Sequence, residues 1–315
     1  MQRGEHFGRA SRFSSQSVKY KFRSQAMNSS DSRFILGLWR IAQWGMSPQQ
    51  VAGLFRECLD LGIDLFDVAD IYGDYRCEAL LGAALQTDPA LKSRIRLIGK
   101  CGIALVSPAR PAHRVKHYNT SREHIIASAE NSLTCLGIER LELLLIHRPD
   151  PLMDADEIAD AFERLGRAGK VKDFGVSNFF PHQFDLLQSR LKEPLQTNQI
   201  EISLTNLNSL FDGTLDQCQK LGVTPQAWSP LAGGRLVQQA ETSLSRALAR
   251  IGNELGITRE QLSIAWLLRH PARIRPVLGS GKIERIRELV AAERVVLERQ
   301  VWFELLEAAQ GAPVP

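Results

Sequence analysis

Four side chains in the sequence form a set suited to proton transfer at a carbonyl oxygen: Asp67, Tyr72, Lys100 and His147. A free phenol has a pKa near 10, too high for easy acid or base work at neutral pH, and an ammonium beside Tyr72 would lower it. Asp67 would hold Lys100 charged and in place. His147 would orient the carbonyl oxygen while Tyr72 donates its proton and a hydride reaches the carbon. Because no side chain supplies hydride, this chemistry requires a cofactor.

Three of these residues stand where strands are expected to end. Asp67, Lys100 and His147 each follow a short apolar run, which is the pattern of a buried strand. Tyr72 lies five residues beyond Asp67, just before Gly73, in a segment that reads as a loop. Taken singly, each has an ordinary interpretation: an aspartate that punctuates a turn, a core histidine or a solvated lysine. Their shared position at strand ends favours a site.

Strands and helices alternate from residue 31 onward, which favours a parallel sheet. We expect strands at 34–39, 65–67, 95–99, 141–146, 174–176, 198–200, 225–228 and 275–278. We expect helices at 48–61, 76–85, 121–136, 154–165 and 181–190, one ending near 222, two within 241–269, and others at 282–292 and 298–309. Eight such units predict an α/β fold of the (β/α)8 TIM-barrel type, as one domain over 31–315. A doubly wound sheet is disfavoured because no Gly-rich turn follows the first strand.

The first 30 residues differ from the rest. They are rich in Ser, Arg and Lys, hold Glu5 as their one acid, and lack the apolar stretch of a secretory signal. We expect a mostly disordered basic leader, although residues 18–22 alternate enough for a strand. A transit peptide, a tail, or a misassigned start with Met27 as the true first residue would all have this composition.

Composition excludes several classes of function. A net charge of +4, spread along the chain, predicts neither nucleic-acid nor membrane binding. No apolar run approaches membrane-spanning length, and 44% of the residues are hydrophobic, enough for a large core. The five cysteines are odd in number and include no CxxC pair, so we expect a reduced, cytoplasmic protein.

Several longer runs of the sequence resemble a known family. The run 66–73, FDVADIYG, resembles the signature of the aldo-keto reductases, and the blocks at 99–100, 144–147, 174–178 and 227–231 resemble later blocks of that family in the same order. The similarity extends from about Phe34 to Glu288. The runs 146–157 and 279–285 most resemble the bacterial oxidoreductases of the YdhF type.

This resemblance implies a reductase of aldehydes or ketones that uses NADP(H), with Tyr72 as general acid in the tetrad named above. It implies that Ser177, Asn178 and Gln199 hold the nicotinamide carboxamide. Trp228 stands where the family usually has the Tyr that stacks on the nicotinamide, and it also offers a flat face. The loop 229–235 would approach the pyrophosphate, through Ser229, Leu231, Gly233 and Arg235.

The last block departs from the family pattern. Many members place Lys directly before the Ser that meets the 2'-phosphate, and here Gly279 precedes Ser280, while Leu289 replaces a common adenine-contacting Asn. Lys282 lies close enough to reach the same phosphate, and Ser280 with the start of the following helix makes a reasonable anion site. The resemblance assigns the adenosine side to Arg285 and Glu288. NADP is therefore preferred over NAD.

The sequence gives less information on the substrate contacts, and it leaves two alternative functions open. Trp39 and Tyr118 are expected in the substrate pocket, Trp44 in neither pocket nor core, and the loops 102–120 and 202–212 would set specificity for a small carbonyl compound. One alternative is a regulatory module that binds the cofactor with little turnover. Another is a metal-dependent hydrolase, which is disfavoured because only one strand end carries a histidine, so no metal is expected.

Overall fold

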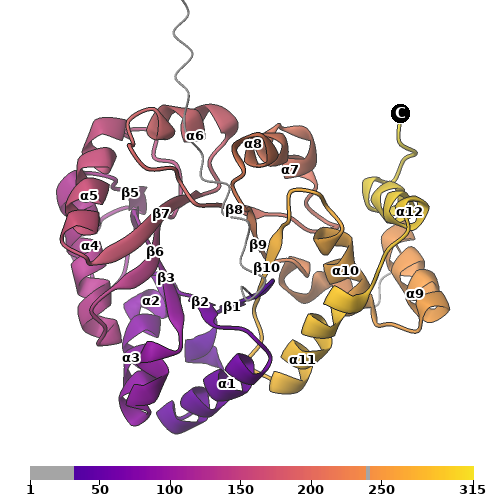
Figure 1. The fold of residues 1–315 in the computed structure, drawn as a ribbon, viewed down its shortest axis with the longest axis horizontal. Coiled ribbons are helices and arrows are strands. Elements are labelled where there is room, and N and C mark those ends of the chain that lie inside the picture. The colour runs from indigo at the N-terminus through magenta and orange to yellow at the C-terminus, as the bar shows by residue number, and fades with distance from the viewer. Residues whose placement is uncertain (1–31, 239–241) are drawn as a thin grey trace, which may run out of the picture.

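Eight parallel strands close into a barrel in the computed structural model, which describes residues 32–238 and 242–315 (Figure 1). The expected leader and Met27 lie outside the described residues. The barrel strands are β1 (Ile35–Gly37), β2 (Leu65–Asp67), β3 (Arg96–Cys101), β6 (Leu141–Ile146), β7 (Val171–Ser177), β8 (Asn198–Glu201), β9 (Gln226–Trp228) and β10 (Arg275–Leu278). Their order is β1-β10-β9-β8-β7-β6-β3-β2. The expected TIM-barrel fold is confirmed.

Helices surround the barrel, and their buried faces form the hydrophobic core outside the strands (Figure 1). The ring consists of α1 (Pro48–Asp60), α3 (Cys77–Thr87), α4 (Arg122–Leu136), α5 (Ala155–Arg167), α6 (Pro181–Gln188), α8 (Thr214–Leu221), α10 (Arg259–Leu268) and α11 (Ile283–Ala291). Several begin where the sequence places a cap. Ser47 and Gln50 form a reciprocal capping box with Pro48 in the first turn of α1. No helix within residues 32–238 and 242–315 is long and apolar enough to cross a bilayer.

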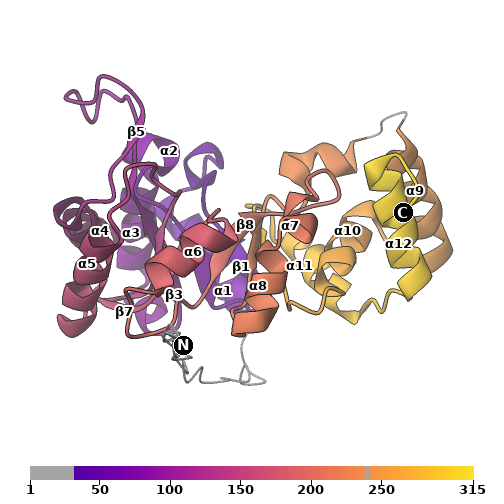
Figure 2. The ribbon, with the colours of Figure 1, turned by 90° about the horizontal axis from the view of Figure 1, so that it is seen from above.

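Two further helices, α9 (Ser243–Leu255) and α12 (Arg299–Gln310), pack side by side outside the ring, next to α10 (Figures 1 and 2). Trp266 and Trp302 tie α10 to α12: their rings stack with centroids 5.0 Å apart. Each indole nitrogen donates to the backbone carbonyl of the other residue, over 3.1 and 3.0 Å. This pair stabilises a second hydrophobic core beside that of the barrel.

The alternation of side chains along each strand decides what points into the barrel. A small cluster of buried strand residues forms one layer of its interior: Ile35, Leu65, Ile98, Leu143, Leu145 and Val277. Asp67 stands two residues after Leu65, Lys100 two after Ile98, and His147 two after Leu145. These three polar residues therefore continue the inward-facing rows at the carboxyl end of the strands.

The segment 102–120 is not the plain loop that we expected. It contains an antiparallel pair, β4 (Ile103–Ala104) and β5 (His117–Tyr118), whose connection projects from one end of the barrel (Figure 2). Each strand has only two residues, which is too short for an alternation of apolar and polar residues to be recognised, so the sequence does not predict this hairpin.

Three other expectations were wrong in detail. Tyr72 is not in an open loop but begins the one-turn helix α2 (Tyr72–Tyr75), in which Gly73 and Asp74 both have φ of 59°. Trp44 packs against the main core and lies directly over Gly281, where an added Cβ would meet its ring at 2.6 Å. The helix expected after β8 is divided into α7 (Asn208–Phe211) and α8 by Gly213, whose φ is 85°.

The remaining short elements connect these parts: 3-10 turns η1 (Ile41–Gln43), η2 (Pro89–Ser93), η3 (Ala232–Val237) and η4 (Ala292–Arg294).

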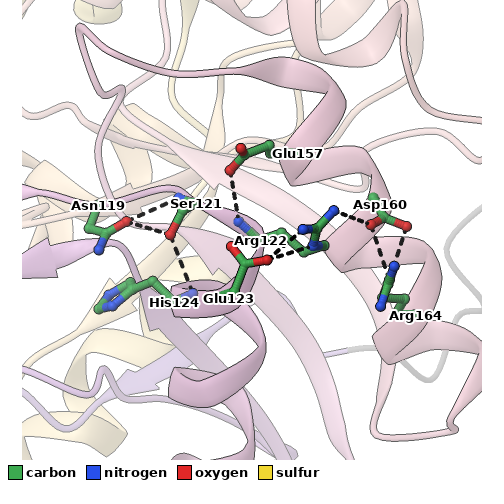
Figure 3. Close-up of polar contacts among 8 residues, drawn as sticks. All are labelled: Asn119, Ser121, Arg122, Glu123, His124, Glu157, Asp160 and Arg164. Carbon is green, nitrogen blue, oxygen red and sulfur yellow. Dashed lines mark hydrogen bonds and ion pairs between the residues drawn. The ribbon is translucent and has the colours of Figure 1, made fainter.

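A polar network fixes the start of α4, directly after β5 in the chain (Figure 3). The Asn119 side chain accepts from the amide and hydroxyl of Ser121, and the Ser121 hydroxyl accepts from the His124 amide. Arg122 joins α4 to α5 through Glu157 and Asp160. The side of the barrel that bears Tyr118 is therefore anchored to two helices.

Candidate active site

Lys100 and Asp67 form a fully buried ion pair at the carboxyl end of β2 and β3. The Lys100 Nζ atom donates to Asp67 Oδ1 over 2.6 Å and to the Val68 carbonyl over 2.9 Å. Lys100 has no exposed surface, and Asp67 is 2% exposed. Burial lowers the pKa of Lys100, but the charges of Asp67 and Tyr72 outweigh it and leave that pKa above its ordinary value. Lys100 is therefore a fixed cation.

Tyr72 lies over this cation and beside His147. The Lys100 Nζ atom is 4.7 Å from the centroid of the Tyr72 ring, and the rings of Tyr72 and His147 meet edge-on with centroids 5.6 Å apart. The structure thus brings together the four residues that we expected to handle the proton. The His147 Nδ1 atom is buried and has no hydrogen-bond partner among the described residues, so packing holds this ring.

The protonation of this group differs from our expectation in one respect. Burial raises the pKa of Tyr72 above its ordinary value, and the opposing Lys100 charge reduces this rise without reversing it. The pKa of His147 lies well below its ordinary value because of burial and the nearby charges of Lys100, Arg148 and Lys116. At neutral pH the site therefore holds a protonated phenol and a neutral imidazole.

A second set of residues supports the first, and sequence reasoning did not assign them this role. Gln226 accepts from Gln199 Nε2 over 2.9 Å, and the Asp70 amide donates to the Lys100 carbonyl over 3.2 Å. The Asp70 carboxylate accepts from the Ile71 amide and from the Ser128 hydroxyl. Burial raises the pKa of Asp70 to about 7. The signal for Asp70 was present in the run 66–73, but nothing in the sequence indicates Ser128 or Gln226.

A cavity of about 810 Å³ opens above these residues, and residues of β1, β2, β7, β8, β9 and β10 contribute to its lining. Its walls include most of the expected site residues: Trp39, Asp67, Tyr72, Tyr118, His147, Ser177, Gln199, Trp228, Ser229, Leu231, Gly233, Ser280, Arg285 and Glu288. Lys100 lies beneath the wall. Asn178 lies behind Trp228 and accepts from its indole nitrogen over 3.0 Å. The side chains of Arg235 and Lys282 are exposed and are not among the lining residues.

One end of the cavity presents an amide-rich wall. The Ser177 hydroxyl donates to the Gln199 carbonyl over 2.8 Å and accepts from the Asn178 side chain over 2.7 Å. Asn178 adopts a φ of 59°, a left-handed conformation that asparagine tolerates better than most residues. This conformation lets Asn178 hold the indole of Trp228 while its amide nitrogen binds Ser177.

The other end lies at the start of α11. Ser280 Oγ accepts from the Lys282 amide over 3.1 Å, and Gly279, Ser280 and Arg285 line the wall. Trp44 packs against Gly281, which directly follows Ser280 in this segment. A helix start with free backbone amides and a nearby guanidinium is suited to an anion.

Four basic residues that sequence reasoning did not assign to the site also line the cavity: Arg40, Arg76, Lys116 and Arg148. Arg148 directly follows His147, so its position at a strand end was visible in the sequence; its orientation was not. Among the described residues, no group of three or more His, Cys, Asp or Glu side chains lies close enough to hold a metal ion.

Comparisons with known proteins agree with this geometry. The model of the Aldo/keto reductase family matches residues 33–309. Oxidoreductase YdhF of Escherichia coli is 52% identical over 286 residues, which cover 90% of this chain and 95% of the relative. A 6-dehydroglucose reductase of Agrobacterium fabrum is 47% identical over 284 residues, covering 90% and 96%.

Solved structures with a similar fold include members of the same family. The crystal structure of an aldo/keto reductase from Klebsiella pneumoniae in complex with NADP and acetate superposes with a TM-score of 0.71 at 26% identity. That superposition covers 90% of this chain and 93% of the Klebsiella chain. The family match spans nearly the whole described barrel, and the observed fold agrees with it. This chain belongs to the aldo/keto reductase family and is an oxidoreductase.

Proposed function

We propose that this protein is an NADPH-dependent reductase that converts an aldehyde or ketone to an alcohol, with the Tyr72 hydroxyl as proton donor. One observation carries the proposal. A phenol that burial keeps protonated faces the main cavity, directly above the buried Lys100–Asp67 pair and beside a neutral His147. Few other arrangements offer a neutral acid together with a fixed positive charge to receive the phenolate that it leaves.

The residues present fit an NADP(H) cofactor. Both hydrogens of Gln199 Nε2 are engaged, by Asp67 and Gln226, so its amide oxygen is the atom able to accept from a carboxamide. Ser177 stands on the same wall, Asn178 lies behind it and donates to its hydroxyl, and Trp228 presents a flat ring. When bound, the cofactor supplies the hydride. The Klebsiella relative was crystallised with NADP, which supports this assignment.

The remaining steps belong to the chain. His147, as a neutral imidazole, donates a hydrogen bond to the carbonyl oxygen and sets its position. Tyr72 transfers its proton to that oxygen as negative charge develops there. Lys100 then stabilises the phenolate, and Asp67 keeps Lys100 from moving away. Trp39 and Tyr118 close the substrate side of the cavity, and we propose both as substrate contacts.

Selection of NADP over NAD falls to the far end of the cavity. Ser280 and Arg285 line the wall at the start of α11, and Glu288 lies one turn further along. We propose Ser280, Arg285 and the exposed Lys282 for the adenosine 2'-phosphate, Glu288 for the adenosine itself, and the loop 229–235 for the pyrophosphate. The names of two relatives, 47% and 38% identical, are 6-dehydroglucose reductase, which supports an aldehyde as the substrate.

A matched pair of variants tests the proposal. Tyr72→Phe removes the proton donor and is expected to lower kcat for aldehyde reduction by about 10²- to 10⁴-fold, the usual contribution of general acid catalysis. Quenching of tryptophan fluorescence by NADPH is expected to be retained. Tyr75→Phe removes a phenol three residues away that serves only the Leu105 amide, and should keep kcat within a few-fold. Full activity in Tyr72→Phe would refute the assignment.

A further inference from the structure

The Arg148 guanidinium is held inside the cavity without a counter-ion. It is half-buried, and its Cζ atom lies 5.3 Å from the centroid of the Trp228 ring. Its one hydrogen bond runs from Nη1 to the carbonyl of its own neighbour, His147, over 3.3 Å. Among the residues that the structure describes, no carboxylate forms an ion pair with it. Burial lowers its pKa from the ordinary value, which reflects the cost of holding this cation away from water.

Two nearby carboxylates are engaged elsewhere. Asp67 is taken by Lys100 and Gln199. Asp150, two residues after Arg148, accepts from the Thr120 hydroxyl over 3.1 Å and from the Leu152 amide over 2.8 Å. Glu201 acts on Arg148 only at longer range. The guanidinium therefore keeps most of its five donors free.

The same contacts fix where those donors stand. The Thr120–Asp150 bond ties the segment after β5 to the loop after β6, so Tyr118 and Arg148 are carried by joined segments. The charge of Arg148 acts on both Tyr72 and Tyr118. Arg148 is also adjacent in sequence to His147. The free donors thus lie beside the place where the carbonyl group would be reduced.

We propose that Arg148 is a specificity residue that hydrogen-bonds oxygen atoms borne by the carbon next to the reacting carbonyl, either an α-hydroxyl group or the oxygens of a carboxylate bonded directly to the carbonyl carbon. The preferred substrates are then α-oxygenated aldehydes and ketones. A guanidinium has donors and no acceptor, and its planar fork matches a carboxylate or a pair of neighbouring oxygens. An unsubstituted alkyl chain would leave these donors unpaired, which a half-buried site penalises. This inference rests on the function proposed above.

The test compares matched aldehydes with the full chain and NADPH. Glyoxylate is paired with acetaldehyde, and 2-hydroxypropanal with propanal, so that each pair differs by one oxygenated group. The measured quantity is the ratio of kcat/KM within each pair, for wild type, Arg148→Met and Arg148→Lys. Hydration of an aldehyde in solution is the same for every enzyme, so it cancels when variants are compared.

We expect Arg148→Met to lower the ratio by about 10-fold or more in at least one pair, as for the loss of a charge-assisted hydrogen bond. A fall in the glyoxylate pair alone, with partial recovery in Arg148→Lys, assigns the role to charge. A fall in both pairs assigns it to the hydrogen-bonding fork. Arg110→Met is the control, because it removes a guanidinium that lies 4.6 Å from the Tyr75 ring but outside the main cavity.

Two results would overturn the inference, and they differ from failure of the proposed function. In the first, both ratios are unchanged in Arg148→Met while all four aldehydes are reduced. In the second, all four rates fall equally, together with weaker NADPH binding by fluorescence, which would assign Arg148 to the cofactor. If the wild type binds NADPH and reduces none of the aldehydes, the proposed function fails, and the inference fails with it.

Discussion

Gln199 and Asp67 meet inside the barrel: the Nε2 atom of Gln199 donates to Asp67 Oδ2 over 2.7 Å, although 132 residues separate them in the sequence. The other oxygen of Asp67 accepts from Lys100. A residue expected to hold the cofactor therefore also completes the hydrogen bonding of Asp67, whose carboxylate belongs to the proposed proton-transfer group. Gln199 couples the cofactor wall to the proton-transfer group.

This coupling predicts the effect of Gln199→Met. The change keeps the volume but leaves Asp67 Oδ2 without its donor in a fully buried site, which costs about 1–3 kcal/mol. The free energy of unfolding, from urea titration, should fall by that amount, and kcat should fall as well. Gln196→Met is the control, because Gln196 is exposed and its side chain binds only the Pro194 carbonyl. Equal stability of both variants would contradict the coupling.

The buried ion pair gives a second prediction. Lys100→Met leaves the Asp67 carboxylate buried without a counter-charge, and we expect a loss of about 3–5 kcal/mol in the free energy of unfolding. The double variant Asp67→Leu/Lys100→Met removes both charges and should recover most of that loss. Reduction should stay abolished in both variants. Recovery of activity along with stability in the double variant would show that the pair is structural only.

The raised pKa of Asp70 predicts how the free energy of unfolding depends on pH. Its pKa rises from 3.8 to about 7 on folding because of burial, so between these values the folded protein keeps a proton that the unfolded chain has lost. This contribution to the free energy of unfolding is complete below pH 3.8 and is lost as pH rises through about 7. Asp70→Asn cannot titrate. From pH 5 to pH 8 the wild type should therefore lose roughly 1–4 kcal/mol relative to Asp70→Asn, at about 1.4 kcal/mol per pKa unit.

The measurement is urea unfolding of both proteins at the two pH values. Asp74→Asn is the control, because it changes an exposed carboxylate in the neighbouring turn. Glu78 adds to the slope of both proteins, since burial raises its pKa to about 7 as well. The charge of Asp70 contributes to that rise less than burial does, so most of the Glu78 slope cancels in the comparison. A difference between wild type and Asp70→Asn that is constant with pH would rule out this account.

Local patterns in the sequence were enough for the barrel and for the tetrad. The strands β2, β6 and β10 have the predicted bounds, because each is a short apolar run between clear breaks. Asp67, Lys100 and His147 were found because inward alternation at a strand end follows from chain order alone.

Features that depend on distant partners were not found. The hydrogen bond from Gln199 to Asp67 and the packing of Trp44 on Gly281 join segments far apart in sequence. Gly73, Asp74 and Tyr75, directly after Tyr72, all have positive φ angles, which the expected loop did not predict. The pKa of Tyr72 was predicted to be lowered and is raised instead, for the same reason. The sequence indicated the charge of Lys100 but not the burial of Tyr72, whose effect on the pKa is larger.

The pKa shifts of Tyr72 and His147 predict the pH profile of the reaction. Tyr72 must be protonated to act as the acid, and its pKa is raised by burial, so the acidic form persists beyond the ordinary phenol range. His147 must be neutral, and its pKa is well below 6.5 because burial and three nearby cations oppose the imidazolium. We therefore expect kcat/KM for reduction to be level from about pH 6 to about pH 9.

Initial rates of NADPH oxidation with a non-titrating aldehyde such as propanal, measured from pH 5.5 to pH 10, would test this profile. A titration midpoint near 6.5 would mean that His147 is solvated rather than buried when the substrate binds. A midpoint near 8 would mean that Lys100 lowers the Tyr72 pKa more than burial raises it. Either result would change the acid that the mechanism requires, because the site would then work with a partly ionised phenol or a charged imidazole.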